Sequence, residues 1–264
     1  MGSATREALV ESRAALAAAD GVDLATAQDL LAAGRTLGRS THLLALVADP
    51  SMEAGEKKSL VERVFGSLIG STALSLLISI AESRWSSSEQ LLAGIEELGL
   101  RAAAISAPAD ADIEGELFAF GTAVRSNAEL ELALSSKLGD DASKAALVEK
   151  LLGATASTQT IAIASQLVQQ PRGRRIGELL ASAAAIIADE SGLAVATVTA
   201  ATPLGEAQIK RLSDRLGEAY GRSVKVNEVI DPTLIGGLRV QIGDDVIDGS
   251  IATRLNELRL KLVG

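Results

Sequence analysis

The sequence predicts an α+β fold that is mainly α, with an N-terminal helical bundle, a second similar helical bundle and a small C-terminal α/β domain. Abundant alanine and leucine, with only 5 prolines in 264 residues, favour helices. From Gly192 onward the apolar pattern changes to the two-residue alternation that is typical of strands. At roughly 150 residues per domain, the length by itself allows more than one domain.

The first predicted bundle spans residues 1–105 and contains five or six short helices. Its clearest helical period runs through residues 60–69, and Pro50 and Gly55 punctuate the neighbouring stripes. Such a stripe either packs into a core or binds a partner helix, and periodicity alone does not separate the two uses. The candidate partner-binding residues of this stripe are Leu60, Val61, Val64, Phe65 and Leu68.

An internal repeat with an offset of 87 residues predicts the second bundle. Residues 28–66 align without gaps over residues 115–153, and nine of these thirty-nine pairs are identical. Chance similarity between two Ala/Leu-rich helices is the alternative. It does not explain a matched glycine at positions 34 and 121, or a shared Lys-x-x-Leu-Val-Glu motif. We therefore expect the bundle to occur twice, over residues 1–105 and 106–190.

The remaining residues, 191–264, predict a small domain in the order strand, helix, strand, strand, helix. Strands are expected over residues 193–200, 224–230 and 237–242, followed by a short extended Val246-Ile247. We expect Thr202 to be the N-cap, and Pro203 the first residue, of a helix that ends near Gly221. Gly236-Gly237 predicts a bulge or a close backbone approach, and Ser250 can cap a last helix.

Composition excludes several classes of function. A net charge of −9 disfavours nucleic acid and anionic lipid as partners, and five aromatic residues are too few for a base-stacking platform. There is no cysteine, and no apolar run reaches the roughly 18–20 residues of a membrane-spanning helix. Phosphate-binding and dinucleotide-binding glycine motifs are absent, so no cofactor is expected.

Three groups of polar residues are weighed as chemical sites. His42 is the only histidine, and we expect it to be solvated at a turn or helix start rather than catalytic. Asp244, Asp245 and Asp248 could hold a divalent cation, but turns and helix caps also favour aspartate. The basic run contains Arg172, Arg174 and Arg175, and it either starts a helix as a solvated face or docks an acidic partner segment.

The C-terminal region resembles one family specifically. Residues 224–243, residues 246–250 and the following apolar positions are similar to the signature of the delta subunit of F-type ATP synthases, whose mitochondrial counterpart is the oligomycin-sensitivity-conferring protein. Ordinary members have one helical bundle, whereas two are predicted here. The signature residues are Asp231, Pro232, Leu234, Ile235, Gly236, Gly237, Asp248, Gly249 and Ser250, and their expected role is architectural.

The resemblance implies a mechanical function without catalysis. It implies a peripheral-stalk subunit that joins the catalytic head of the synthase to the membrane-anchored b subunits and resists rotor torque. The implied partners are the N-terminal helices of the α subunits and the b subunits, at the cytoplasmic face of the cell membrane. The terminal apolar residues Leu255, Leu258 and Leu262 are a further candidate packing or partner surface.

Two alternatives from other classes remain. A metal-dependent enzyme would use the cluster of Asp244, Asp245 and Asp248. A generic acidic helical adaptor would account for the helices and the charge, but it would leave the pattern over residues 231–250 unexplained.

Overall fold

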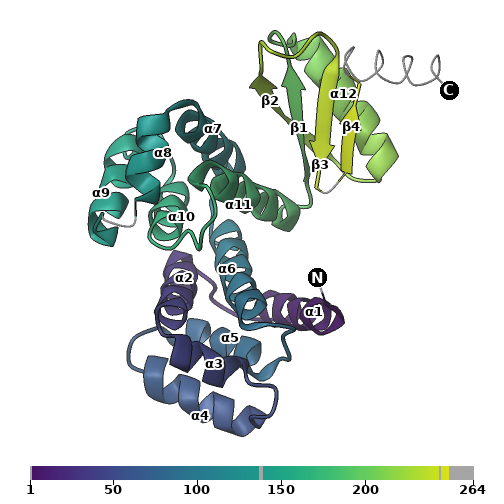
Figure 1. The fold of residues 1–264 in the computed structure, drawn as a ribbon. Helices are drawn as coiled ribbons and strands as arrows, with labels where there is room; N and C mark the ends of the chain where they lie inside the picture. The colour runs from purple at the N-terminus through teal and green to yellow at the C-terminus, as the bar shows by residue number, and fades with distance from the viewer. Residues whose placement is uncertain (1, 137–138, 244, 250–264) are drawn as a thin grey trace, which may run out of the picture. The chain divides into compact units, whose positions relative to one another are not determined.

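The computed structural model describes residues 2–136, 139–243 and 245–249. These residues form twelve helices and four strands, which confirms a mainly α-helical α+β fold (Figure 1). The chain packs as two compact units, Met1–Ile187 and Ala188–Gly264. The first unit holds the helices of both predicted bundles, and the second holds the sheet.

Six helices precede residue 106, as the sequence predicts. Side chains cap several of them, because Asp23, Ser40 and Ser87 each accept a hydrogen bond from a backbone N–H in the first turn of the following helix. The helices are α1 (Ser3–Ala17), α2 (Leu24–Arg39), α3 (Thr41–Ala48), α4 (Ala54–Phe65), α5 (Ser71–Glu82) and α6 (Ser88–Ile105).

The five following helices repeat the pattern of α2–α6. Helices α8 and α9 begin and end 87 residues after α3 and α4, and α10 begins 87 residues after α5. The match therefore extends beyond the aligned residues 28–66. These helices are α7 (Ile113–Ser126), α8 (Ala128–Ser135), α9 (Asp141–Leu152), α10 (Thr158–Val168) and α11 (Ile176–Glu190).

Tertiary contacts recur at the same offset. The Asp29 carboxylate accepts a hydrogen bond from the backbone N–H of Gly70 (2.8 Å). Its counterpart Glu116 accepts one from the backbone N–H of Ser157 (3.0 Å). Both copies share one hydrophobic core. The division of these helices into separate domains near residue 105 stays a prediction.

Helix α6 belongs to both sets of helices. It packs on α1, α2 and α5, and it also contacts α10. Its six consecutive residues 98–103 are all buried, which requires neighbours around the whole helix. Because α6 also lies 87 residues after α1, it is the counterpart of α1 in the second set.

The second unit contains a four-stranded sheet with helix α12 (Glu206–Tyr220). The strands are β1 (Ala194–Ala200), β2 (Val224–Ile230), β3 (Leu238–Ile242) and β4 (Asp245–Asp248), in the order β2-β1-β3-β4. Strands β1 and β2 are parallel and the other pairs are antiparallel. The apolar face of α12, with Leu212 and Leu216, packs with the buried alternate residues of β1.

The predicted start of the helix in this unit is wrong, and so is the bulge, one of the two alternatives predicted for Gly236-Gly237. Helix α12 begins at Glu206, because the backbone N–H of Leu204 donates to the Glu228 carboxylate (2.6 Å) and Gly205 occupies the N-cap position. Gly236 and Gly237 precede β3 rather than forming a bulge inside it, and both have positive φ (64° and 82°). The predicted last helix after Ser250 lies outside the described residues.

Candidate docking surfaces

The candidate chemical residues do not converge on a catalytic site. His42 is exposed in the first turn of α3. Asp245 and Asp248 lie three residues apart on β4, so their side chains project from opposite faces of the sheet and cannot share one cation. Asp244 lies outside the described residues, and the described part of the chain contains no cluster of three His, Cys, Asp or Glu residues suited to a metal ion.

The predicted partner stripe of α4 is divided between core and surface. Val61 and Phe65 are buried at 1% and 2% exposure, and Leu60 and Val64 pack against the core from half-buried positions. Leu68 is 68% exposed, so it offers the largest apolar surface of the five. The other predicted partner residues, Leu255, Leu258 and Leu262, lie outside the described residues.

A groove of about 310 Å³ lies between the C-terminal end of α1 and the N-terminal part of α5. Four of its six lining side chains are alanine, serine or threonine, and these small side chains let a helix approach closely. The six lining residues are Ala15, Ala19, Asp20, Thr72, Ser75 and Leu76. We call this surface the α1–α5 groove.

The equivalent surface of the second copy, between α6 and α10, is covered. Gln159, the counterpart of Thr72, is buried and its side-chain N–H donates to the carbonyl of Ser106 at the end of α6 (3.4 Å). Helix α2 packs against both α6 and α10. Leu24 and Gln28 of α2 and Ala162, the counterpart of Ser75, line one hollow of about 270 Å³. A helix of the chain itself therefore occupies this position in the second copy.

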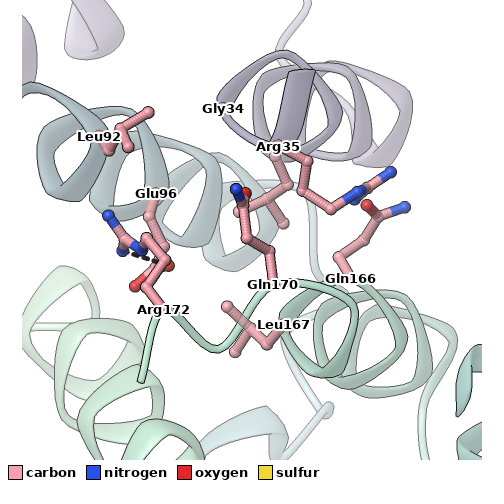
Figure 2. Close-up of a pocket in the computed structure, with 9 residues that line it drawn as sticks. Gly34, Arg35, Leu92, Glu96, Gln166, Leu167, Gln170 and Arg172 are labelled. Carbon is pink, nitrogen blue, oxygen red and sulfur yellow. Dashed lines mark hydrogen bonds and ion pairs between the residues drawn. The ribbon is translucent and has the colours of Figure 1, made fainter. Parts of the chain in front are cut away.

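An ion pair between Glu96 and Arg172 lies at the junction of α2, α6 and α10 (Figure 2), and Arg174 shares the same carboxylate. The Glu96 carboxylate of α6 accepts hydrogen bonds from Arg172 (2.6 Å) and Arg174 (2.7 Å), which lie in the loop before α11. Burial lowers the pKa of Arg172, and the Glu96 charge opposes that effect. Two members of the predicted basic run thus bind an internal carboxylate, while Arg175 is exposed.

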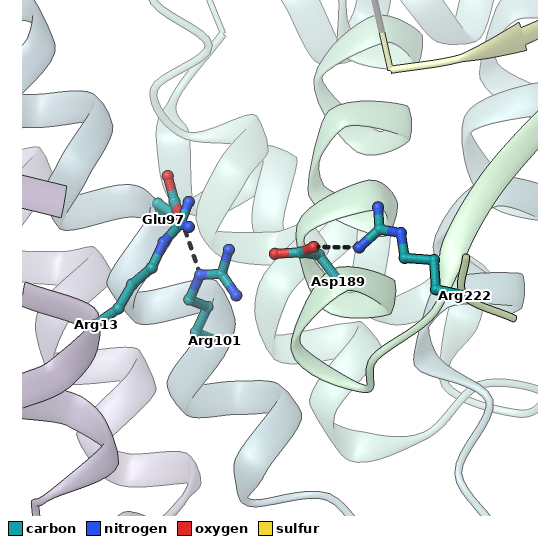
Figure 3. A network of polar contacts seen from close by, with 5 residues as sticks. All are labelled: Arg13, Glu97, Arg101, Asp189 and Arg222. Carbon is teal, nitrogen blue, oxygen red and sulfur yellow. Dashed lines mark hydrogen bonds and ion pairs between the residues drawn. The ribbon is translucent and has the colours of Figure 1, made fainter. Parts of the chain in front are cut away.

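Each unit also contains a smaller polar link (Figure 3). In the first unit, Glu97 of α6 binds Arg13 of α1 (2.5 Å) and Arg101 one turn along its own helix (2.9 Å). In the second unit, Asp189 at the end of α11 binds Arg222 just before β2 (2.9 Å). The pair between Arg13 and Glu97 links α1 to α6, which lie far apart in the sequence.

Six of the nine predicted signature residues lie in the connection from β2 to β3, while Asp248 ends β4, Gly249 follows it and Ser250 lies outside the described residues. Asp231 donates its backbone N–H to the carbonyl of Ala200, the last residue of β1 (2.9 Å), so the connection crosses the end of that strand. The Asp231 carboxylate accepts hydrogen bonds from the Thr233 hydroxyl (2.6 Å) and backbone N–H (2.9 Å), which lower the pKa of Asp231. Gly249 donates to the carbonyl of Leu238 (2.9 Å).

Comparison with known proteins identifies the family. The family model for the ATP synthase delta (OSCP) subunit matches residues 100–262. ATP synthase subunit delta of Leifsonia xyli subsp. xyli is 54% identical over 265 residues, covering 100% of both chains. The subunit of Streptomyces avermitilis is 40% identical and covers 98% of this chain and 97% of that one. The chain belongs to the ATP synthase delta (OSCP) subunit family.

Family membership establishes the general function. The chain is a non-catalytic, peripheral-stalk subunit of an F-type ATP synthase, and the alternatives of a metal-dependent enzyme and an unrelated adaptor are wrong. None of its described helices has the length and apolar character needed to cross a bilayer. The family model covers the last turns of α6, α7–α12 and the sheet, so α1–α5 and most of α6 are the part of this delta-family chain that lies outside the match.

Sequence reasoning missed two exposed features of this delta-family subunit. Four of the six residues that line the α1–α5 groove are alanine, serine or threonine, and a groove of such small side chains has no distinct pattern in a single sequence. Ile235 was assigned an architectural role with the other signature residues, but its side chain is 68% exposed. Exposure of one apolar residue in a loop has no signal in a single sequence.

Proposed function

We propose that this subunit holds the head of the synthase through the α1–α5 groove and the stalk through its C-terminal unit. In this proposal the groove binds the N-terminal helix of a head α subunit, and the C-terminal unit binds the b subunits. The subunit would work at the cytoplasmic face of the cell membrane as a peripheral part of the complex.

The observation that carries the head contact is the contrast between the two copies. The α6–α10 surface of the second copy already accommodates a helix, α2, whereas its counterpart, the α1–α5 groove, is open. Residues of α2 that line the hollows on α6 and α10 include Leu24, Gln28, Leu31 and Arg35, spaced by four, three and four residues. This spacing describes one face of an amphipathic helix, which is the ligand we expect.

Exposed apolar side chains support the stalk contact. Ile230 ends β2 and Ile235 lies in the connection to β3, and their side chains are 42% and 68% exposed. Val246 and Ile247 of β4 are 47% and 52% exposed. Apolar side chains left at the surface of a small unit favour burial against a partner. The α-helical b subunits would supply such a surface.

Peptide binding tests the head contact. A peptide of the α-subunit N-terminus is titrated calorimetrically into the full chain and into Ser75→Arg, which places a long charged side chain in the groove. We expect micromolar binding to the parent and at least tenfold weaker binding to Ser75→Arg. An exposed serine on α4 gives the matched control, Ser59→Arg, which should bind like the parent.

Two results would contradict the proposal. Absence of binding to the parent chain would show that the head is not held through this helix. Equal binding to the parent and to Ser75→Arg, with intact helical circular dichroism, would show that the helix docks elsewhere.

A further inference from the structure

A second, larger cleft lies on the second copy, far along the chain from the α1–α5 groove. Its volume is about 1300 Å³, above the range of roughly 300–1000 Å³ that suits small ligands. We call it the α8 cleft. It is lined by the end of α7, by α8, by the start of α9, by residues 169–175 and by Glu178 of α11.

The α8 cleft is positive although the chain has a net charge of −9. Five lining residues are cationic, namely Arg125, Lys144, Arg172, Arg174 and Arg175. Three are anionic, namely Glu131, Asp141 and Glu178. A local potential opposite in sign to the whole chain favours an acidic partner at this position.

Internal ion pairs leave part of this positive charge unmatched. The single Glu96 carboxylate serves both Arg172 and Arg174. The single Asp141 carboxylate likewise serves both Arg39 and Lys144. Two carboxylates thus face four cations, so each site retains an excess of positive charge that a further carboxylate can stabilise.

Arg125 and Arg175 complete the cationic rim. Arg125 donates to the Gly177 carbonyl (3.1 Å) and the Thr122 hydroxyl (3.0 Å). Burial lowers its pKa, and the charges of Glu178 and Glu131 oppose that effect. Arg175 is exposed, and the described part of the chain shows no ion pair for it.

An apolar anchor lies among these charges. Leu132 of α8 lines the cleft, and its side chain is 69% exposed. Helix α8 also has a buried side, at Leu134, so the packing of the helix does not require an apolar residue at the exposed position 132. An exposed leucine inside a charged cleft combines the two features of amphipathic recognition, an apolar contact and a polar rim.

Comparison of the two copies shows which side chains of the α8 cleft have no equivalent in the first copy. Helices α3 and α8 have the same length at the same offset, yet Leu132 corresponds to Ala45, and Arg125 corresponds to Gly38. The loop before α6, residues 83–87, contains one arginine, whereas residues 170–175 contain three. Arg172 and Arg174 also serve the fold through Glu96, whereas Leu132 and Arg175 are exposed, so the presence of these two side chains in one copy needs a reason other than folding.

We propose that the α8 cleft binds an acidic amphipathic segment of a partner protein. Carboxylates of the segment lie against Arg125 and Arg175, and an apolar side chain covers Leu132. This inference goes beyond the proposed head and stalk contacts, because it uses a different surface of the other copy.

Fluorescence anisotropy of the full chain tests the proposal. The probe is a labelled synthetic peptide of fourteen residues in which pairs of glutamates alternate with pairs of leucines. A second peptide, which has glutamine in place of every glutamate, is the uncharged control. We expect the glutamate peptide to bind at least tenfold more tightly than the glutamine peptide. The variants Leu132→Asp and Arg175→Glu should each weaken binding at least tenfold, and salt should weaken it further.

Matched controls come from the first copy. Ala45→Asp changes the counterpart of Leu132, and Arg63→Glu reverses an exposed arginine on α4. Both should leave peptide binding unchanged, and circular dichroism should report intact helices in all four variants.

No binding of the glutamate peptide, equal binding of the glutamine peptide, or equal effects of the control variants would overturn the proposal. The α-subunit peptide should still bind Leu132→Asp, so failure here is separable from failure of the head contact.

Discussion

At the scale of single residues, the clearest constraint is the Glu96 carboxylate. Its side chain is 17% exposed and serves two guanidinium groups whose side chains are 22% and 33% exposed. The partners are 76 and 78 residues away in the sequence. Sequence pattern could show a basic run at residues 172–175, but it could not show that an acidic residue on a distant helix would bind it.

We expect Glu96→Gln to lower the free energy of unfolding by about 1–2 kcal/mol. The substitution leaves Arg172 and Arg174 partly buried without a neutralising charge, and their remaining exposure reduces the cost below that of a fully buried pair. Urea unfolding of the full chain measures the change. Glu62→Gln is the control, because Glu62 is 48% exposed and its ion pair with Lys58 spans 4.0 Å, so its effect should stay within about 0.5 kcal/mol.

At the scale of elements, local sequence signals predicted most helices and strands and failed where a distant contact decided the outcome. In the structure, Ser40 and Ser87 cap α3 and α6 through contacts with the first turn, so these helix starts depend only on neighbouring residues. The predicted start at Thr202-Pro203 failed because Glu228, on β2, holds the backbone of Leu204 outside the helix. The glycines before β3 were identified as special, but their reason is positive φ rather than crowding in a bulge.

This revised reason gives a prediction for Gly236. A valine at φ 64° is strained, so Gly236→Val should destabilise the second unit by about 1–3 kcal/mol. Tyr220 is the only tyrosine and lies in this unit, so its ring NMR signal can follow thermal unfolding there.

Gly55→Ala is the contrasting variant: a Cβ there meets open space, and the change should leave stability equal or raise it by up to about 1 kcal/mol. Equal melting of parent and Gly236→Val would contradict this explanation.

At the scale of the whole molecule, the repeat explains how the chain provides both scaffold and surfaces. Sequence alignment located the repeat because identical residues such as Leu30 and Leu117 fill equivalent buried positions. It could not show that α2 would cover the second copy, or that one core would run from α1 to α11. A part of a stalk that transmits force benefits from such continuity, because a core shared by both copies resists separation of one from the other.

Fluorescence of Trp85, the single tryptophan, can test whether the two copies unfold together. Trp85 lies in the first copy, and its indole N–H donates to the Ile80 carbonyl (2.8 Å). Leu30→Ala and its counterpart Leu117→Ala each remove a side chain with 0% exposure, at a cost of about 2–5 kcal/mol. If the copies unfold together, both variants should lower the urea midpoint reported by Trp85 fluorescence by similar amounts. If residues 1–105 and 106–190 are independent domains, Leu30→Ala should shift the Trp85 transition and Leu117→Ala should leave it in place.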